Sequence, residues 1–306
     1  MPSARAWTDA KLEEMEKHLD QIYKKASKEI GKTWKAYMKE SGEEIAELQK
    51  KYDAAKESGD EKEKKRLGRE LAAKKKERTL YDKHYKDMTE HLAHELSRTN
   101  EIAAAYINDQ LPGVYVVNYN EIATEIDGVN AGISFDLVDE RTVKALATKD
   151  ETLLPYKDIT KKDVRWNTKA VNSQVLQGIL QGESMDEIAK RLGNVTAMDA
   201  NAAIRNARTA VTGAENRGRM DMLHDARSKG VIMNKIWLAT NDSRTRDAHA
   251  ELDGQEQAPD DPFESELGNI MYPGDPTAGP ANVYNCRCTL RYKVVGFERN
   301  GKVTKV

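Results

Sequence analysis

One histidine and two cysteines are the residues of this 306-residue chain best suited to metal chemistry. His249 precedes Cys286 and Cys288, which are the two cysteines of the sequence. Zinc accepts an imidazole nitrogen together with thiolates, and a carboxylate could complete the ligand set. The candidates for that carboxylate are Asp242, Asp247 and Asp253. One histidine and one Cys-x-Cys nevertheless fall short of the two spaced pairs that zinc sites usually show.

The same residues allow two further interpretations. A Cys286 or Cys288 nucleophile activated by His249 would need a third residue to orient the histidine, together with an oxyanion-binding element. The sequence identifies neither of these, so we predict no catalytic residue. In the other interpretation, His249 forms a hydrogen bond with a carboxylate, and the two thiols pack on one strand face.

A polar network is the interpretation that we favour. The surrounding segment is dense in Asp and Arg, which hold one another through charge-assisted hydrogen bonds. Its helix and last strand are too short to bury an apolar face alone, so polar contacts must supply the specificity of the fold. We therefore expect no cofactor, with zinc on His249, Cys286 and Cys288 as the alternative. The network that we predict to converge in space comprises Asp242, Arg244, Arg246, His249, Asp253, Asp275, Cys286 and Cys288.

Short elements are predicted to position these side chains. Residues 232–240 alternate in polarity as a half-buried strand does. Residues 241–243 then offer a turn and a helix N-cap, and a short helix is expected over residues 244–252. Asp242 and Arg246 are four residues apart, a spacing that suits an ion pair at the start of that helix.

The rest of the C-terminal region is predicted to contain a loop, a turn and a final strand. Asp253-Gly254 suits the end of the short helix, because glycine readily adopts the left-handed conformation found there. Residues 256–269 are acidic and polar, which indicates a surface loop. Residues 272–276, Tyr-Pro-Gly-Asp-Pro, predict a rigid turn because both prolines preset φ. Residues 286–293 are expected to form the last strand.

Long helices are predicted for the N-terminal part. Apolar residues recur every three or four positions over residues 7–55, and Ser58-Gly59-Asp60 then interrupts the pattern. A second run over residues 67–102 predicts an antiparallel hairpin of two long helices. Leu111-Pro112-Gly113 is expected to end the second arm, and residues 114–117 to form a short strand because they are β-branched and aromatic.

Positive charge gathers near the tip of this hairpin at Lys74, Lys75 and Lys76. Such a cluster attracts the phosphate backbone of nucleic acid, so these three lysines are the candidate DNA contact. Acidic and basic residues are interleaved over residues 57–78, however, and this favours a solvated helix surface. The formal net charge of −2 adds no general attraction to nucleic acid.

A helical middle is predicted next. Ser184 and Glu187 form a capping-box pattern at the start of a helix over residues 185–192. Gly193-Asn194 is expected to close this helix, and a longer one to cover about residues 198–228. The first helix resembles the opening helix of a helix-turn-helix motif. A short recognition helix does not follow it, so DNA reading by this element is not expected.

The predicted fold class is α+β: mainly helical, with a long N-terminal helical hairpin and a small mixed α/β C-terminal core. Charged residues make up 33% of the chain and the mean hydropathy is −0.77. No apolar run approaches the roughly 18 residues of a membrane-spanning helix, and the N-terminus lacks the apolar core of a signal peptide. The division that we predict is a hairpin over residues 1–110, an irregular connection over 111–165, a helical middle over 166–230, a C-terminal core over 231–295 and a tail over 296–306.

The C-terminal motifs resemble the phage head-morphogenesis family, the minor head proteins typified by protein F of phage Mu. The resemblance depends on the order and spacing of several short motifs and covers residues 165–295. These motifs are Trp237, Asp242-Ser243-Arg244-Thr245-Arg246, His249, Leu252-Asp253-Gly254, Tyr272-Pro273-Gly274-Asp275-Pro276 and Asn285-Cys286-Arg287-Cys288. The stretch from Ala207-Arg208-Thr209 to Asn216-Arg217-Gly218-Arg219 is similar to the helix that precedes this core in the family.

The resemblance implies a non-enzymatic virion component that acts in head morphogenesis. It implies association with the portal vertex, and therefore the phage portal protein as partner, with scaffold protein, major capsid protein and double-stranded DNA as further candidates. The protein would be made in the host bacterial cytoplasm and reside in the head interior. Two alternatives stay open: a DNA-binding virion protein organised or delivered with the genome, and an enzyme or toxin-related core. A toxin fusion would need a further C-terminal domain, which we do not expect after Tyr292.

Overall fold

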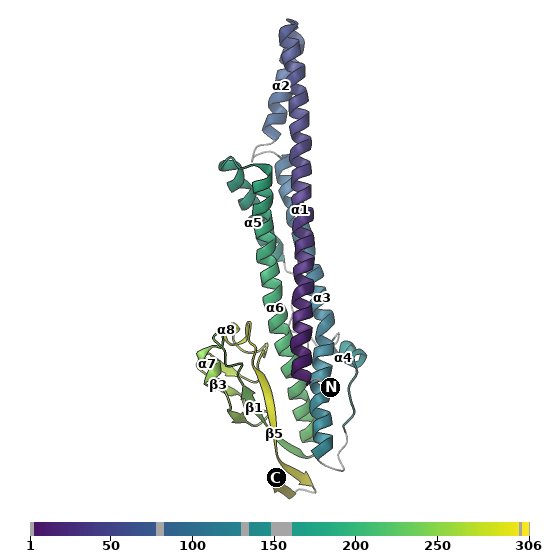
Figure 1. Cartoon of the computed structure of the whole chain (residues 1–306), viewed down its shortest axis with the longest axis vertical. Coiled ribbons are helices and arrows are strands. Elements are labelled where there is room, and N and C mark those ends of the chain that lie inside the picture. The colour runs from purple at the N-terminus through teal and green to yellow at the C-terminus, as the bar shows by residue number, and fades with distance from the viewer. Residues whose placement is uncertain (1–2, 78–82, 130–134, 148–160, 300–301, 306) are drawn as a thin grey trace. The chain divides into compact units, whose positions relative to one another are not determined.

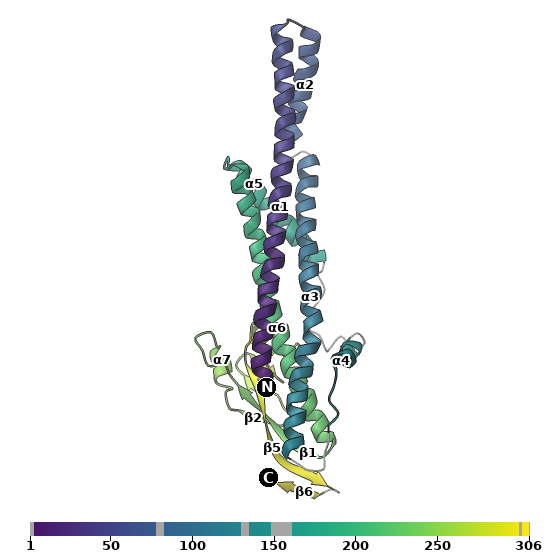
Figure 2. The ribbon, with the colours of Figure 1, turned by 45° about the vertical axis from the view of Figure 1, so that its right-hand side comes forward.

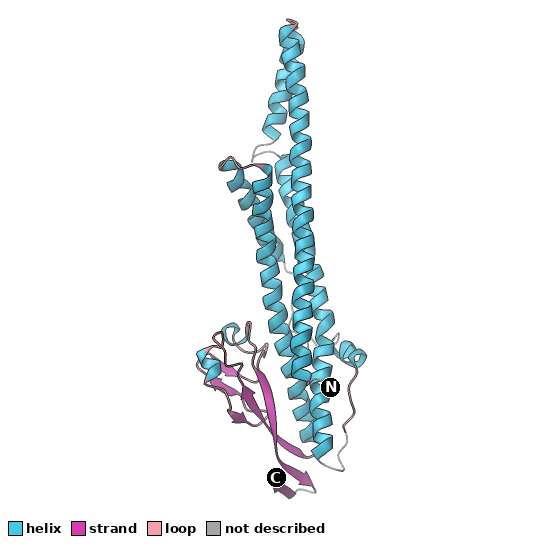
Figure 3. Ribbon diagram, in the orientation of Figure 1, coloured by secondary structure: helices cyan, strands magenta, loops and turns pink. Residues whose placement is uncertain are grey.

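The protein is mainly helical, and its strands lie in the C-terminal part of the chain (Figures 1 and 3). The computed structural model describes residues 3–77, 83–129, 135–147, 161–299 and 302–305. The α+β prediction, with long N-terminal helices and a small C-terminal sheet region, is confirmed. Among the described residues, no helix combines the length and the apolarity that crossing a bilayer requires.

Fourteen elements follow one another along the described chain. The helices are α1 (Ala4–Glu57), α2 (Glu61–Glu77), α3 (Lys83–Val129), α4 (Glu140–Ala147), α5 (Lys161–Leu180), α6 (Met185–Ser228), α7 (Asp247–Ala250) and α8 (Pro280–Val283). The strands are β1 (Val231–Leu238), β2 (Glu256–Gln257), β3 (Phe263–Ser265), β4 (Gly268–Ile270), β5 (Thr289–Arg299) and β6 (Lys302–Lys305).

Two compact units make up the chain, and each combines non-consecutive ranges. The first unit contains Met1–His18, Ala104–Lys157 and Ala202–Val306. The second contains Leu19–Ala103 and Asp158–Asn201. The division into five consecutive parts that the sequence suggests stays a proposal about independently folding segments.

In the second unit, α2 runs back beside α1, as the predicted hairpin requires (Figure 2). Gly59 makes the turn with a positive φ of 73°, and the Asp60 carboxylate accepts a hydrogen bond from the Glu63 amide at 3.0 Å. An ion pair of 2.9 Å joins Lys74 to Glu44 across the two helices. The second arm of the hairpin is therefore helical at its start, as predicted, and α3 begins a separate helix at Lys83.

Helix α3 overturns two predictions. It continues through Leu111-Pro112-Gly113, where an end was expected, and includes residues 114–117, where a strand was expected. Pro112 removes one backbone donor from the helix interior. Leu111 and Val114 are nevertheless fully buried, and the burial of apolar side chains offsets the lost hydrogen bond. The irregular connection predicted from residue 111 thus begins with helix up to Val129.

Helix α6 likewise passes the residues that were expected to end it. Its capping box is confirmed, since the Ser184 hydroxyl accepts from the Glu187 amide at 3.3 Å and Glu187 accepts from the Ser184 amide at 2.7 Å. Gly193 lies inside the helix, and a β-carbon added there would lie 3.3 Å from Oγ of Ser27 on α1. The glycine therefore allows close helix packing and does not end α6.

In the first unit, a four-stranded antiparallel sheet has the order β2-β1-β5-β6. Pairing between β1 and β5 runs from Val231 opposite Phe297 to Leu238 opposite Thr289. Alternate residues of β1 are buried, which confirms the predicted strand. One apolar cluster packs this sheet against α3 and α6, and its buried members are Tyr119, Ile122, Ala123, Ile126, Phe135, Met222, Leu223, Ala226, Val231 and Met233.

The segment predicted as a surface loop over residues 256–269 is more ordered than expected. It contains β2 and most of the β3–β4 hairpin. Phe263 is fully buried and packs edge-on against Trp237, with ring centroids 5.3 Å apart. The prediction gave weight to the acidic composition and not to Phe263, which is buried. The prediction of a surface loop is therefore wrong for β3.

Lys235 is a fully buried cation on β1. Its ammonium group donates hydrogen bonds to the carbonyls of Pro259 at 3.0 Å and Met271 at 2.9 Å. Burial lowers the pKa of Lys235 from 10.5 to about 8, against the opposing influence of Asp261, Asp260 and Asp275. Between these two pH values the unfolded chain binds more protons than the folded chain, so this lysine makes stability rise with pH.

We predict that Lys235→Met removes this pH dependence. From about pH 8 to about pH 10, the unfolding free energy of the wild type should rise by about 2 kcal/mol relative to the variant. Urea unfolding of both proteins across this range measures the difference. The account requires the difference between the two proteins to change across this pH range. A difference that stays constant, whatever the cost of the two unpaired carbonyls in the variant, would contradict it.

Candidate functional site

His249 lies on the short helix α7 and is 1% exposed. Its Nε2 is 2.8 Å from Oδ1 of Asn282. The amide nitrogen of Asn282 donates to the Gly268 carbonyl at 2.9 Å, which orients the amide so that its oxygen faces the imidazole. Nε2 therefore donates a hydrogen bond to Asn282, and Nδ1 is the ring nitrogen left to interact with other groups.

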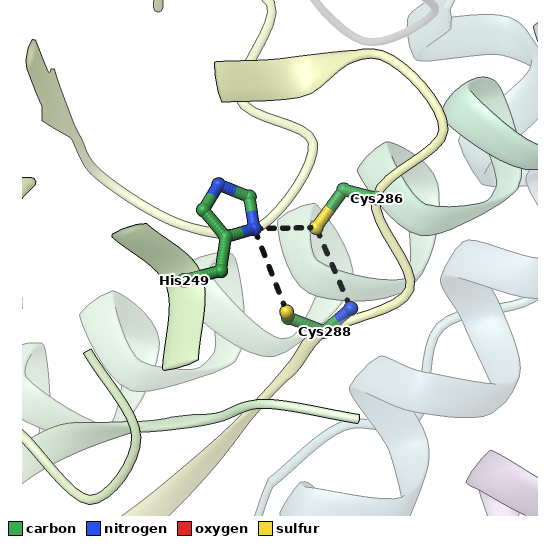
Figure 4. A group of neighbouring side chains, drawn as sticks. All are labelled: His249, Cys286 and Cys288. Carbon is green, nitrogen blue, oxygen red and sulfur yellow. Dashed lines mark hydrogen bonds between the residues drawn. The ribbon is translucent and has the colours of Figure 1, made fainter. Parts of the chain in front are cut away.

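The Nδ1 atom of His249 faces both cysteine sulfurs (Figure 4). Nδ1 lies 3.5 Å from Sγ of Cys286 and 3.7 Å from Sγ of Cys288. The three ligand atoms lie within 4.8 Å of one another, and all three residues are buried. The structure thus brings together the three residues that the sequence singles out as the zinc alternative.

Both cysteines precede β5 and are held there by α6. The Thr212 hydroxyl donates to the Cys286 carbonyl at 2.8 Å. Asn216 accepts from the Leu290 amide at 2.8 Å and donates to the Cys288 carbonyl at 3.4 Å. These contacts fix the backbone on both sides of each sulfur, so the sulfur positions follow from α6.

The two thiols have opposite electrostatic environments. Hydrogen bonding from Cys286, reinforced by His249 and by the backbone of Thr240, lowers the pKa of Cys288 to about 5 despite burial. The contact with Cys288, together with burial, raises the pKa of Cys286 well above its usual value. The Cys288 amide also donates to the Cys286 sulfur at 3.4 Å. The two sulfurs are therefore coupled, because the ionisation of one opposes the ionisation of the other.

The predicted network is distributed over several separate sets of contacts. Asp242 forms a two-pronged ion pair with Arg287, at 2.5 and 2.6 Å, and does not form the expected pair with Arg246. The Arg287 guanidinium holds the pKa of the Asp242 carboxyl well below its usual range. Arg246 donates to the Tyr284 carbonyl, whereas Arg244 is exposed and lies 3.9 Å from Asp242.

Asp253 and Asp275 each stabilise a local turn. Asp253 accepts from the Ala239 amide at 2.8 Å. Asp275 accepts from the amides of Met271 at 3.1 Å and Thr277 at 2.8 Å. These carboxylates are occupied by backbone donors, and neither belongs to the described group of three metal-ligand side chains. The short helix expected over residues 244–252 is reduced to α7, with Arg246 as its N-cap.

The Tyr-Pro-Gly-Asp-Pro turn packs directly on α6. Gly274 has a φ of 82°, and a β-carbon there would lie 2.6 Å from the Gly213 backbone nitrogen. Gly218 makes a similar approach, since its added β-carbon would lie 2.6 Å from the Tyr115 carbonyl oxygen on α3. These glycines let α6 lie in backbone contact with both its neighbours.

The burial of polar residues on α6 was not predicted from the sequence. Glu215 is 1% exposed, and it accepts from Arg5 at 2.9 Å and from the Thr289 hydroxyl at 2.7 Å. Arg219 is also buried and donates to Asn118 at 2.8 Å. The sequence signal that could have found them is the presence of polar residues within the helical stretch 210–216. The structure buries every residue of that stretch.

The three candidate DNA-binding lysines lie in the last turn of α2. Lys74 pairs with Glu44, and Lys75 donates to the Gln49 side chain at 3.1 Å. Lys76 lies beside them in sequence and also has an interaction partner. Cations in the last turn of a helix are favourable next to its exposed carbonyls, so a structural role accounts for this cluster.

Comparison with known proteins connects this site to a family. Residues 169–291, which include the relevant part of α6, His249 and both cysteines, match the family described as Phage Mu protein F like protein. The part of the chain that contains the candidate site is therefore similar to this family. It is similar to the minor head protein GP7 of Bacillus phage SPP1, with 29% identity over 293 residues that cover 93% of this chain and 87% of that protein.

A second relative is named for a different activity. It is the NAD(+)–arginine ADP-ribosyltransferase EFV of Enterococcus faecalis, 32% identical over 127 residues. The match covers 42% of this chain but 26% of that protein. No solved structure gives a significant match to the chain.

We predict that Asn216→Ala destabilises the protein by about 2 to 4 kcal/mol. The change leaves the buried Leu290 amide without an acceptor and the Cys288 carbonyl without its donor, and unpaired buried groups cost about 1 to 3 kcal/mol each. Asn216→Asp should cost at least as much, because its second oxygen cannot donate to the Thr212 and Cys288 carbonyls and buries a charge beside them. Urea unfolding measures both losses.

The matched control is Asn201→Ala, an exposed asparagine on the same helix. It should change the free energy of unfolding by less than about 0.5 kcal/mol. Equal losses for the two alanine variants would show that the Asn216 contacts do not hold β5.

Proposed function

We propose that the protein is a phage minor head protein that acts in head morphogenesis, in contact with the portal protein at the portal vertex of the head interior. The observation that carries the proposal is the similarity to GP7, which extends over 93% of this chain. The helices of both units are therefore included in the similarity, together with the family motifs around His249. Scaffold protein and major capsid protein are further candidate partners.

The α5–α6 turn is our candidate for the contact with portal. Leu180 and Met185 flank this turn and are 72% and 41% exposed. Exposed large apolar side chains on both sides of one turn offer apolar surface to a protein partner. The neighbouring charges, Glu183 and Arg191, are paired with each other at 2.5 Å and so leave the turn without a free charge of their own.

We predict that the protein co-purifies with portal from unfilled heads. Leu180→Ser combined with Met185→Ser should lower the co-purified amount at least about tenfold, because burial of the two side chains at the contact supplies about 3 kcal/mol. Circular dichroism checks that the double variant keeps its helices, and Lys190→Ala, an exposed change on α6, serves as the control. Absence of the wild type from the portal fraction would contradict the proposal.

We infer that the protein is not an enzyme, although one relative is named as a transferase. The match covers a quarter of that relative, 26%, so the activity of the whole relative is not carried over. Incubation of the reduced, full-length protein with labelled NAD(+) and an arginine-rich acceptor protein should transfer no more label than a heat-unfolded sample does. Transfer that increases with time and protein concentration would establish an enzyme.

DNA binding is the second candidate function, and it rests on Lys74, Lys75 and Lys76. The ion pair of Lys74 with Glu44 offsets one of these charges, and the hydrogen bond of Lys75 to Gln49 occupies one of its donors. Any duplex binding there would be weak and steeply salt-dependent. Tight binding that survives high salt would favour this candidate over a purely structural role.

A further inference from the structure

We propose that Nδ1 of His249 and the sulfurs of Cys286 and Cys288 bind one thiophilic divalent cation, Zn²⁺ by chemical preference. The ion would join α7 to the segment that precedes β5. This inference is independent of the proposed head-assembly function, since it concerns the ligands and the stability of the first unit alone.

The distances fit a tetrahedral zinc ion. Zinc–nitrogen bonds of about 2.0–2.1 Å and zinc–sulfur bonds of about 2.3 Å place nitrogen and sulfur about 3.6 Å apart on a tetrahedral edge. The two observed nitrogen–sulfur distances are 3.5 and 3.7 Å. A hydrogen-bonded thiol would explain one such distance. The single lone pair of Nδ1 cannot accept full hydrogen bonds from two thiols, whereas one cation can bind all three atoms.

The histidine is held in the tautomer that a ligand needs. Nε2 donates to Oδ1 of Asn282, which is fixed in turn by its contacts with Ser265 at 3.2 Å and the Gly268 carbonyl at 2.9 Å. Metal-bound histidines usually donate their second nitrogen to such a partner, which sets the ring orientation. Asn282 is fully buried, so its only evident role is to position this imidazole and the β3–β4 hairpin.

The surroundings suit two thiolates. The Cys288 amide points at the Cys286 sulfur at 3.4 Å. Trp237, Leu252 and Phe263 contribute to the apolar cluster that contains both cysteines. A divalent cation with two thiolates and a neutral imidazole carries no net charge, which is the arrangement that can be buried among apolar side chains at least cost.

Three side chains leave one coordination position. The described group contains no fourth His, Cys, Asp or Glu. Of the three carboxylates that the sequence offers, Asp242 is occupied by Arg287 and Asp253 by the Ala239 amide. The third, Asp247, is exposed and does not belong to the group. Zinc with three protein ligands binds water in the fourth position, and we assign water here.

The test is the metal content of the reduced, full-length protein. Inductively coupled plasma mass spectrometry should find about one zinc ion per chain. Replacement of zinc by Co²⁺ should give a thiolate-to-metal charge-transfer band in the absorption spectrum. Cys286→Ser with Cys288→Ser should lose both signals. His249→Gln keeps an amide near Nε2 that can donate to Asn282 but has no ligand atom at Nδ1, so it should keep the fold and bind zinc at least about tenfold more weakly. His91→Ala, an exposed histidine on α3, is the control.

Each outcome decides the proposal. A wild type that holds less than about a tenth of an equivalent of zinc and gives no charge-transfer band with Co²⁺ would overturn it. Unchanged zinc affinity in His249→Gln would also overturn it, because Nδ1 would then not be a ligand. If the double serine variant does not fold, the wild-type band and the His249→Gln affinity still decide. Loss of stability on chelation, absent in His249→Gln, would support it.

Discussion

The side chain of Asn216 connects helix α6 to the start of strand β5 through hydrogen bonds. Its side-chain oxygen accepts from the Leu290 amide at the start of β5, and its nitrogen donates to the Cys288 carbonyl and, within α6, to the Thr212 carbonyl. All of these groups are buried, so none can exchange its partner for water at low cost. The chain from Cys286 to Leu290 therefore has one position on α6. The β1–β5 pairing, the apolar cluster around Trp237 and the place of the two sulfurs all depend on that position.

The fixed position of this segment on α6 also explains why two glycines lie on that helix. Gly213 and Gly218 allow the Tyr-Pro-Gly-Asp-Pro turn and α3 to approach the α6 backbone. Because the neighbours lie so close, the polar groups of this stretch are sealed from water, and Glu215 must find Arg5 and Thr289 as partners. Close packing and the pairing of Glu215 are thus two consequences of one arrangement, and both belong to the region that matches the Phage Mu protein F-like family.

Much of this fold could be predicted from the sequence, and the failures share a physical cause. The periodicity of α1, the capping box of Ser184 and the alternation of β1 depend on neighbouring residues, and all three predictions are confirmed. Pro112, Gly193 and Phe263 were misinterpreted because their roles depend on distant residues that bury or crowd them. For the candidate site, residue type and spacing identified His249, Cys286 and Cys288. The α6 contacts that place the sulfurs could not be predicted, because they join residues more than 70 positions apart.

If the account is correct, α6 and the cysteine segment form one cooperative unit. Amide hydrogen exchange of the full-length protein tests this most directly, because the Leu290 amide is held by a side chain of α6. The account predicts that Leu290 and the α6 amides of residues 212–219 have opening free energies that agree to within about 1 kcal/mol. Rapid exchange at Leu290 while α6 stays protected would contradict it, since the segment would then open without the helix.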